Sequence, residues 1–483
     1  MANIVLVFPP YLSSYKSPPL GVAYLAAVAE RAGHQATLID MNGLGTCFSE
    51  LSQRLTEIEP DIVGVSFMTN QFGNAIKAAQ TARSALPQAS IVLGGNHASA
   101  LPEESLGYDA VDYVILREGE VTFLELIEAL EGQKIAPQDI KGLAFRHEGQ
   151  VVRTPPRELI EDLDSLPFPK WDDFPVEAYS DRLVGVGDTH PVFSVLTSRG
   201  CPNKCAFCSS HTVFTRKYRK RSAKNIFAEL EYLEERFGAQ HFHFVDDTLT
   251  IDKDRVRELC SLVRDNGKNY RWIANARVNT VSKELLREMY LAGCRNLGYG
   301  VESGDPAVRK AIAKGISSEQ IRNAHTWARE AGLITSSYFM VGNMGETWES
   351  IDKTIALAKE LNSDNPNCAI ATPFPDTTMM AEAEKHGWLR TKDWDQYITT
   401  PHIVPDYLPV SSNGILTVEE MLRAYYKVSA SFAEAKLITR YGKRYWLNPR
   451  LYAREIVNRS RRQGVVSTTR LGLKLLRGKV LGR

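Results

Sequence analysis

Short apolar runs alternate with stretches of helical periodicity through residues 1–140 of the chain. A short apolar run suits a strand that is buried on both faces, while apolar positions three and four apart predict an amphipathic helix. The alternation predicts an α/β fold, a parallel sheet covered by helices, and five strands suit a flavodoxin-like (Rossmann-type), doubly wound domain. The predicted strands are Ile4–Phe8, Ala36–Ile39, Ile62–Ser66, Ile91–Leu93 and Val111–Leu116, and the predicted helices are Leu20–Ala32, Phe48–Ile58, Asn74–Leu86, Pro102–Leu106 and Val121–Leu130.

A second alternating series occupies residues 191–400. Its six strand–helix units predict a partial (β/α)6 barrel of the TIM-barrel type, whose site would lie at the carboxyl ends of the strands. The predicted strands are Phe193–Thr197, His241–Val245, Trp272–Ala276, Asn296–Val301, Ser336–Val341 and Cys368–Ala371, and the predicted helices include Ala223–Phe237, Lys253–Asn266, Lys283–Ala292, Ser318–Ala331 and Thr347–Leu361.

Two further segments complete the predicted organisation. Residues 141–190 predict a linker, in which Leu143–Phe145 and Val151–Arg153 form a hairpin and several prolines follow. Residues 401–483 predict a helical, basic region whose first helix spans Thr417–Ala433. From residue 436 to residue 483 the chain has 14 Lys and Arg against one acid.

Composition indicates the compartment. With 43% hydrophobic and 24% charged residues, the 483-residue chain has the make-up of an ordinary soluble globular protein. Seven cysteines without a paired framework indicate a reducing cytosol. No signal peptide and no run of about 18 apolar residues is found, so we expect a cytoplasmic protein. The basic end, interleaved with apolar residues, predicts peripheral contact with anionic membrane lipids; RNA, or a tail without any partner, are the alternatives.

Three closely spaced cysteines, Cys201, Cys205 and Cys208, follow the first predicted barrel strand. Three thiolates can hold three irons of a [4Fe–4S] cluster, and the next cysteine is as far away as Cys260, so the fourth iron would be open to a non-protein ligand. Zinc held by the three thiols and His211 is the alternative. An odd number of thiols in a reducing compartment argues against a disulfide.

The C-x3-C-x2-C spacing after a strand, with Phe207 before the last cysteine, resembles the radical S-adenosylmethionine (SAM) superfamily. The resemblance implies that Cys201, Cys205 and Cys208 are the cluster ligands and that SAM chelates the open iron. It also implies reductive cleavage of SAM to a 5′-deoxyadenosyl radical, with electrons from an external donor such as flavodoxin or ferredoxin.

Polar residues follow the predicted barrel strands at positions where this family holds SAM. Two adjacent acids can accept hydrogen bonds from the SAM ammonium or ribose, an arginine can neutralise its carboxylate, and a glycine-rich turn resembles the one beside the adenine. A helix cap is the alternative role for the two acids. The residues assigned to SAM are Asp246, Asp247, Arg277, Glu302, Gly342 and Glu346.

Three neighbouring patterns are less determined by the sequence. The turn Thr372–Thr377 resembles the family's P-x-P-G-T turn but has Asp376 where Gly is usual. His241 and His243 share one face of their strand and predict either a metal pair or packed side chains. Lys314 fits the family as part of a helix end.

Loops rich in glycine and small polar residues follow the predicted strands of residues 1–140, which lets a large ligand approach the backbone. The run Pro18–Ala26 (P-P-L-G-x-A-Y-L-A), a G-G-x-H turn and an E-G-E turn resemble the cobalamin-binding domain that precedes many radical SAM cores. The D-x-H-x-x-G motif, whose histidine ligates cobalt, is absent, so the lower cobalt ligand stays open; a domain that binds nothing is the alternative. The residues assigned to cobalamin are Pro9, Leu20, Gly21, Ser66, Asn70, Gly94, Gly95, His97, Glu118, Gly119 and Glu120.

Together the two resemblances imply a cobalamin-dependent radical SAM enzyme. The predicted reaction is methylation of an unactivated carbon in a biosynthetic pathway, on a small-molecule substrate or, judged from the tail, a lipid-like one. An oxidative cyclase or rearrangement enzyme, and a non-enzymatic cobalamin or iron–sulfur sensor, are the alternatives. A tRNA methylthiotransferase would need three further cysteines in its N-terminal domain, where only Cys47 is found, so no nucleic-acid partner is expected.

Overall fold

The computed structural model describes residues 1–12, 16–132, 135–179 and 191–441. The chain forms two compact units, residues 1–426 and 427–483, which are treated separately. The predictions made for the basic tail beyond residue 441 lie outside the described residues. All of the site residues lie in the first unit.

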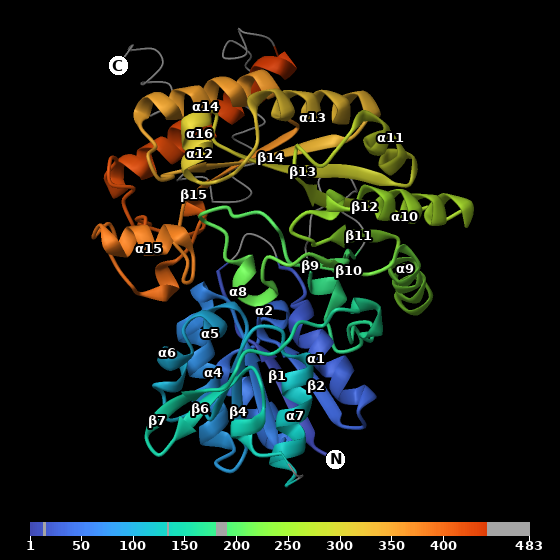
Figure 1. The fold of residues 1–483 in the computed structure, drawn as a ribbon, viewed down its shortest axis with the longest axis vertical. Coiled ribbons are helices and arrows are strands. Elements are labelled where there is room, and N and C mark those ends of the chain that lie inside the picture. The colour runs from blue at the N-terminus through green and yellow to red at the C-terminus, as the bar shows by residue number, and fades with distance from the viewer. Residues whose placement is uncertain (13–15, 133–134, 180–190, 442–483) are drawn as a thin grey trace, which may run out of the picture. The chain divides into compact units, whose positions relative to one another are not determined.

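The N-terminal sheet has the order β2-β1-β3-β4-β5-β6-β7, in which β1 to β5 are parallel (Figure 1). The predicted five-stranded, doubly wound arrangement is confirmed. The predicted hairpin, β6 and β7, extends this sheet in the antiparallel sense, so it belongs to the sheet although it had been expected in the linker. The strands are β1 (Asn3–Phe8), β2 (Gln35–Asp40), β3 (Ile62–Ser66), β4 (Ser90–Gly94), β5 (Tyr113–Ile115), β6 (Leu143–His147) and β7 (Gln150–Arg153).

Helices cover this sheet in two pairs, with α1 beside α7 and α3 beside α4. Buried Val5, Val63 and Ile91 pack in one apolar core with residues of α3 and α4, because alternate strand residues point to opposite faces. The helices are α1 (Leu20–Arg31), α2 (Met41–Leu44), α3 (Phe48–Ile58), α4 (Phe72–Ala85), α5 (Asn96–Ala100), α6 (Pro102–Leu106) and α7 (Glu120–Leu130).

The second sheet is fully parallel, in the order β15-β14-β13-β12-β11-β8, which confirms the predicted barrel-type core. Phe242, Leu297 and Phe339 are buried on its helix-covered face. A short antiparallel pair, β9 and β10, lies next to it in sequence. The strands are β8 (Phe193–Val195), β9 (Ser198–Arg199), β10 (Arg219–Lys220), β11 (His241–Phe244), β12 (Arg271–Ala276), β13 (Cys294–Glu302), β14 (Ile334–Val341) and β15 (Asn365–Ile370).

Side-chain caps begin several helices of the core. Ser222, Asp252 and Ser282 each accept a hydrogen bond from a backbone N–H in the first turn of α9, α10 and α11, as good N-caps do. The helices are α8 (Ser210–Phe214), α9 (Ala223–Phe237), α10 (Lys253–Asp265), α11 (Lys283–Leu291), α12 (Pro306–Ala311), α13 (Ser318–Ala331), α14 (Trp348–Leu361) and α15 (Thr378–Lys385).

The last described helix, α16 (Val418–Tyr441), is longer than the predicted Thr417–Ala433. No Gly or Pro interrupts the sequence before Gly442, so nothing local stops the helix at the predicted end. Short 3₁₀ turns complete the described chain: η1 (Thr69–Gln71), η2 (Pro137–Asp139), η3 (Leu163–Ser165), η4 (Val176–Ala178), η5 (Leu249–Ile251), η6 (Trp394–Gln396) and η7 (Pro401–Ile403).

The described part of the linker packs against its neighbours. Trp171 is fully buried and its ring centroid lies 5.0 Å from that of Phe193 on β8. Asp173 accepts a hydrogen bond from the backbone N–H of Leu38 on β2, at 2.9 Å. Residues 141–179 therefore contact both sheets, and the limits of the four predicted domains stay a prediction.

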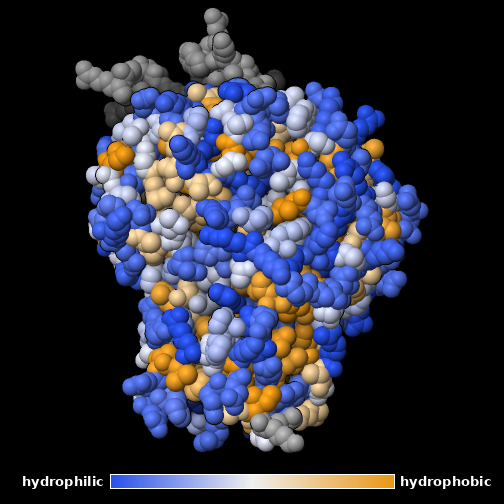
Figure 2. All heavy atoms as spheres, in the orientation of Figure 1, coloured by the Kyte–Doolittle hydropathy of each residue, from blue (hydrophilic) through white to orange (hydrophobic). Residues whose placement is uncertain are grey.

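Hydrophilic side chains cover most of the face drawn in Figure 2, while apolar side chains gather in the region where Figure 1 places α1 and α7. Among the helices of the described ranges, none combines the length and the hydrophobicity that crossing a bilayer requires.

Candidate cofactor sites

The three cysteines lie on one loop that follows β9. Gly200, directly before Cys201, has φ +82°, and a Cβ there would stand 2.2 Å from the carbonyl oxygen of Lys217. Only glycine fits such a turn, which explains its presence directly before the first cysteine. Within the loop the backbone N–H of Cys208 donates to the carbonyl of Cys205 at 3.2 Å.

The loop is also held by the core on either side. The backbone N–H of Ala206 donates to the carbonyl of Ile312 after α12, and its carbonyl accepts from the N–H of Met379 in α15, both at 2.9 Å. Burial raises the pKa of the Cys208 thiol to about 11, so a metal that binds there has to displace a proton. Soft thiols on one loop are the donor set that an iron–sulfur cluster takes.

The alternative metal sites find no geometric support. Across the ranges that the structure describes, no three His, Cys, Asp or Glu side chains converge as they would on a single ion. The ring of His211, proposed as a fourth zinc ligand, has its Nδ1 3.5 Å from Asp376 instead. His241 is buried and His243 half-buried on β11, outside any such group.

Two of the predicted SAM residues are linked to the cluster loop, Arg277 directly and Glu302 through Lys314. Arg277 has Nη1 3.5 Å from the sulfur of Cys205 and donates through Nη2 to the carbonyl of Lys314. The ammonium of Lys314 lies 2.7 Å from Glu302 and 5.8 Å from the ring centroid of Phe207. Both partners of this ion pair are 8% exposed. Sequence reasoning assigned Lys314 only to a helix end and missed this contact.

The adjacent acids at the end of β11 have different surroundings. Asp246 is buried and accepts hydrogen bonds from the N–H and hydroxyl of Thr197, at 3.3 and 2.8 Å. It also accepts a hydrogen bond from the hydroxyl of Ser198. Asp247 is exposed and accepts a hydrogen bond from Ser210. Neither acid caps α10, whose cap is Asp252. Asp246 thus ties β11 to the lead-in of the cluster loop, while Asp247 remains open to a ligand.

The glycine-rich turn after β14 is organised by its own glutamate. Glu346 accepts from the backbone N–H groups of Gly342 and Asn343, at 2.5 and 3.3 Å. Burial raises its pKa to about 7, although these hydrogen bonds oppose the shift. Gly342 has φ +89°, and a Cβ there would stand 2.1 Å from the methyl group of Met421. The turn is therefore preformed, and the role of both residues in SAM binding stays a prediction.

The departure from the family pattern at Asp376 has a structural explanation. Its backbone is left-handed, with φ +61°, which glycine would adopt more easily but Asp tolerates. Its carboxylate accepts from the hydroxyl of Thr212 in α8, at 2.9 Å. The side chain therefore fastens this turn to the helix that follows the cluster loop.

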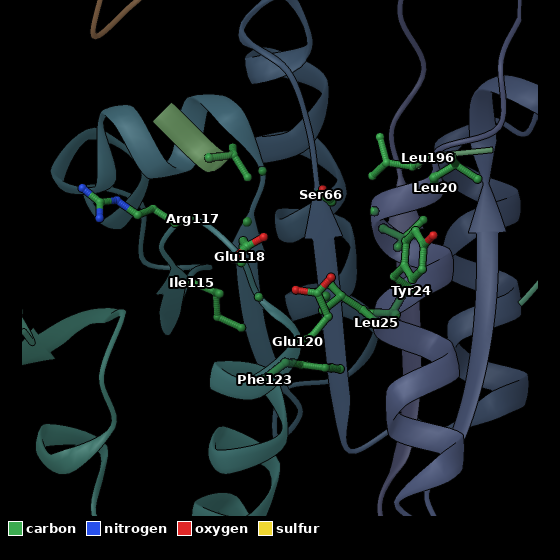
Figure 3. A pocket seen from close by; sticks show the side chains of 18 of the residues that line it. Leu20, Tyr24, Leu25, Ser66, Ile115, Arg117, Glu118, Glu120, Phe123 and Leu196 are labelled. Carbon is green, nitrogen blue, oxygen red and sulfur yellow. The ribbon is translucent and has the colours of Figure 1, made fainter. Parts of the chain in front are cut away.

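A cavity of about 360 Å³ lies at the carboxyl ends of both sheets. Figure 3 shows Glu118 and Glu120 on one side of it and Leu20, Tyr24 and Leu25 of α1 facing them. The core contributes Leu196 and Val245, among others. The predicted cobalamin residues that line the cavity are Leu20, Gly21, Ser66, Gly94, Gly95, Glu118, Gly119 and Glu120.

Glycines leave part of this cavity open. A Cβ at Gly21 would meet no atom within 4 Å, and one at Gly94 would meet only the carbonyl of Ile115 at 3.9 Å. Neither residue has a positive φ, so the fold does not need glycine at these positions. The missing side chains leave room, and the mostly apolar lining suits the nucleotide base and corrin edge of a cobalamin.

The glutamates of the E-G-E turn are paired with arginines of the core. Arg199 lies 3.0 Å from Glu118 and 2.5 Å from Glu120, and Arg219 lies 2.7 Å from Glu118. Burial alone would raise the pKa of Glu120, but the charge and hydrogen bond of Arg199 lower it overall. No role was assigned to Arg199 or Arg219 from the sequence, and the structure places them opposite each other across β9 and β10.

Three predicted cobalamin contacts do not line the cavity. His97 is fully buried inside α5, with its ring centroid 4.7 Å from that of Phe72 and 5.2 Å from that of Trp394. Pro9 and Asn70 flank the cavity strands in sequence but are not part of its lining. Among the residues that the structure describes, no histidine lines this cavity.

The face of the core sheet opposite its helices is polar. Asn275, Gly298 and Ser336 are in register on β12, β13 and β14, and a Cβ at Gly298 would stand 2.5 Å from Asn275 Oδ1 and 2.9 Å from the hydroxyl of Tyr338. Tyr338 is 39% exposed, although it lies on an inner strand of the sheet. Packed barrels fill such positions with Val, Ile and Leu, whereas this face carries amide and hydroxyl groups.

Comparisons with known proteins agree with this geometry. Residues 195–358 match the model of the radical SAM superfamily, and residues 13–127 match that of the B12 binding domain. A protein of Pyrococcus horikoshii named "Uncharacterized methyltransferase PH0819" is 33% identical over 438 residues, which cover 89% of this chain and 92% of the relative. The chain belongs to the cobalamin-binding radical SAM enzymes. The cofactors of this radical SAM enzyme are a [4Fe–4S] cluster, SAM and cobalamin, and a reductant and a small-molecule substrate are required.

Two further comparisons place this radical SAM enzyme among its relatives. An anaerobic magnesium-protoporphyrin IX monomethyl ester cyclase of Cereibacter sphaeroides is 30% identical and covers 92% of this chain, which spans 74% of that relative. The solved structure of the methyltransferase TsrM from Kitasatospora setae, with cobalamin and a [4Fe–4S] cluster bound, superposes with a TM-score of 0.71. At 19% identity over 89% of this chain and 91% of that one, it supports the fold alone.

Proposed function

We propose that this enzyme transfers a methyl group from SAM to an unactivated carbon of a small, polar molecule in a biosynthetic pathway. The observation that carries the proposal is that Leu196 and Val245, at the strand ends beside the cluster loop, line the same cavity as Gly94 and Glu118 of the N-terminal sheet. When bound, the three cofactors supply one-electron chemistry and a methyl carrier. The chain would bring them together and exclude water through this mostly apolar lining.

The chain's own residues have separable roles in this proposal. Cys201, Cys205 and Cys208 would hold the cluster, and Arg277, directly after β12, would keep their loop in place. Asp247 is exposed at a strand end and would accept a hydrogen bond from SAM. Gly21 and Gly94 would leave space for cobalamin.

The polar face of the core sheet favours a hydrogen-bonding substrate over a lipid. Asn275 and Tyr338 lie over Gly298, so an amide and a hydroxyl line this face and can exchange hydrogen bonds with a polar molecule but not with a lipid chain. The lipid-like substrate was suggested by the tail alone. The tail beyond residue 441 is proposed to touch anionic membranes, and a flavodoxin or ferredoxin is proposed as electron donor.

Oxidative cyclisation or rearrangement is the second candidate, because one relative that covers most of this chain is named a cyclase. A sensing protein is the third; it would bind SAM without cleaving it. These functions differ in their products.

The test is an anaerobic product assay. The protein with reconstituted cluster and hydroxocobalamin is mixed with SAM and dithionite, and separately with the aqueous and the chloroform phase of a cell extract. Formation of both 5′-deoxyadenosine and S-adenosylhomocysteine, stimulated by the aqueous phase, would support methylation of a polar molecule. Deoxyadenosine alone would favour cyclisation or rearrangement, stimulation by the chloroform phase would refute the polar substrate, and intact SAM with every fraction would favour sensing.

A further inference from the structure

Arg199 joins a buried group of charges between the cluster loop and the cobalamin cavity. Its two terminal nitrogens lie 3.0 Å from Glu118 and 2.5 Å from Glu120, and its guanidinium carbon is 5.3 Å from the ring centroid of Tyr24 and 5.4 Å from that of Phe214. The arginine is 4% exposed and the glutamates 5% and 8%. A planar guanidinium suits this role because it can bind two carboxylates while its faces lie against aromatic rings.

The pairing of β9 with β10 brings two arginines together, which requires a carboxylate between them. Arg199 and Arg219 are direct cross-strand partners, and like charges in that position repel each other. Glu118 lies between them and accepts hydrogen bonds from both, at 3.0 Å and 2.7 Å. Without this bridge, two buried positive charges would face each other with no water to screen them.

The same residues touch both cofactor sites. Glu118, Glu120 and Arg199 line the cobalamin cavity, and Arg199 is two residues from Cys201. Gly200 between them packs closely against the backbone of Lys217, because a Cβ there would stand 2.2 Å from the Lys217 carbonyl oxygen. A shift of the E-G-E turn would therefore move Arg199, and only one residue separates Arg199 from the start of the cluster loop.

We propose that Arg199 is a positioning residue that couples the two cofactor sites. Cobalamin in the cavity fixes the E-G-E turn, the paired carboxylates fix Arg199, and Arg199 fixes the loop that holds the cluster. Because such coupling is reciprocal, an assembled cluster strengthens cobalamin binding by the same factor by which cobalamin stabilises the cluster loop. The inference rests on the proposed function in one respect, because it requires that both cofactors bind. It does not require that the enzyme transfers a methyl group.

The test measures the coupling without any substrate. Hydroxocobalamin is titrated into full-length protein with and without reconstituted cluster, and the ratio of the two dissociation constants is the coupling factor. The electron paramagnetic resonance (EPR) spectrum of the dithionite-reduced cluster is recorded with and without cobalamin. In the unmodified protein we expect a ratio of about fivefold or more and a spectrum that changes on cobalamin binding.

Two variants break the link in different ways. Glu120→Gln removes one charge and keeps the side-chain volume, and Arg199→Lys keeps the charge but loses the fork that reaches both carboxylates. In either folded variant the ratio should fall toward one and the spectrum should stop responding to cobalamin. The matched control is Glu229→Gln, which disrupts an equally buried pair with Arg221, 0% and 5% exposed, outside the cavity lining; its ratio should stay unchanged.

A ratio of one in the unmodified protein would overturn the proposal, as would equal ratios in all variants. Weaker cobalamin binding by Glu120→Gln in the absence of the cluster, with the ratio preserved, would make Glu120 a direct ligand contact and would also overturn it. Failure of the methyltransferase proposal would appear only in the products of the SAM assay, so the two failures are distinguishable.

Discussion

Replacing Gly200 by alanine should damage the cluster loop more than an ordinary glycine replacement would. The left-handed backbone, at φ +82°, costs an L-residue about 1–2 kcal/mol. The new Cβ would also stand 2.2 Å from the carbonyl oxygen of Lys217, about 1 Å inside normal contact, and overpacking of this kind costs about 1–3 kcal/mol. Together the two effects predict that Gly200→Ala lowers the free energy of unfolding by about 2–5 kcal/mol.

Gly238→Ala is the matched control, since Gly238 has φ +66° and no atom within 4 Å of its would-be Cβ. This variant has only the cost of the left-handed backbone, so its free energy of unfolding should fall by about 1–2 kcal/mol. The assay is urea unfolding of both cluster-free variants, followed by iron content after reconstitution. Equal losses in the two variants, together with full iron loading of Gly200→Ala, would refute the claim that Lys217 forces glycine at this turn.

The remaining predictions concern three separate sites. His97→Ala should destabilise the fold by about 2–4 kcal/mol because it empties a buried aromatic site, yet leave the EPR spectrum of bound cob(II)alamin unchanged; a changed nitrogen splitting would reinstate His97 as a cobalt ligand. The pKa of Glu346 is raised to about 7, so the folded protein holds its proton longer than the unfolded chain, and stability should fall as the pH rises from about 4.5 to about 7. In urea unfolding over this pH range, the free energy of unfolding of Glu346→Gln should fall by about 3 kcal/mol less than that of the unmodified protein. A pH profile parallel to that of the unmodified protein would contradict the prediction. Asn275→Leu should lower kcat/KM for the true substrate about tenfold through a lost hydrogen bond, and an unchanged value would remove Asn275 from the substrate site.

Local patterns in the sequence were sufficient for the elements of both sheets. Alternation of apolar runs and helical periods located the strands from Ile4–Phe8 to Cys368–Ala371, because burial on both faces selects continuous apolar runs. The spacing from Cys201 to Cys208 was equally local. These signals are carried by neighbouring residues, and a single sequence displays them directly.

Contacts between distant segments could not be predicted in this way. The pairing of Arg199 with Glu118 joins residues 81 positions apart, and nothing near either residue indicates the other. His97 follows a glycine pair as expected, but it lies in α5, and its packing beside Trp394 depends on a segment almost 300 positions later. Lys314 was assigned to a helix end from its neighbours, whereas its ammonium pairs with Glu302, the last residue of β13.

The hairpin β6–β7 has a consequence for dissecting the molecule. It pairs with β5 in register, from Tyr113 opposite Phe145 to Ile115 opposite Leu143, and Arg146 donates to the carbonyl of Val111 at 2.6 Å. A fragment ended at residue 140 would leave β5 as a bare edge, with unpaired backbone groups open to association with other chains. A soluble N-terminal fragment should therefore extend through the hairpin and past Pro155, whose carbonyl still accepts from Gly142.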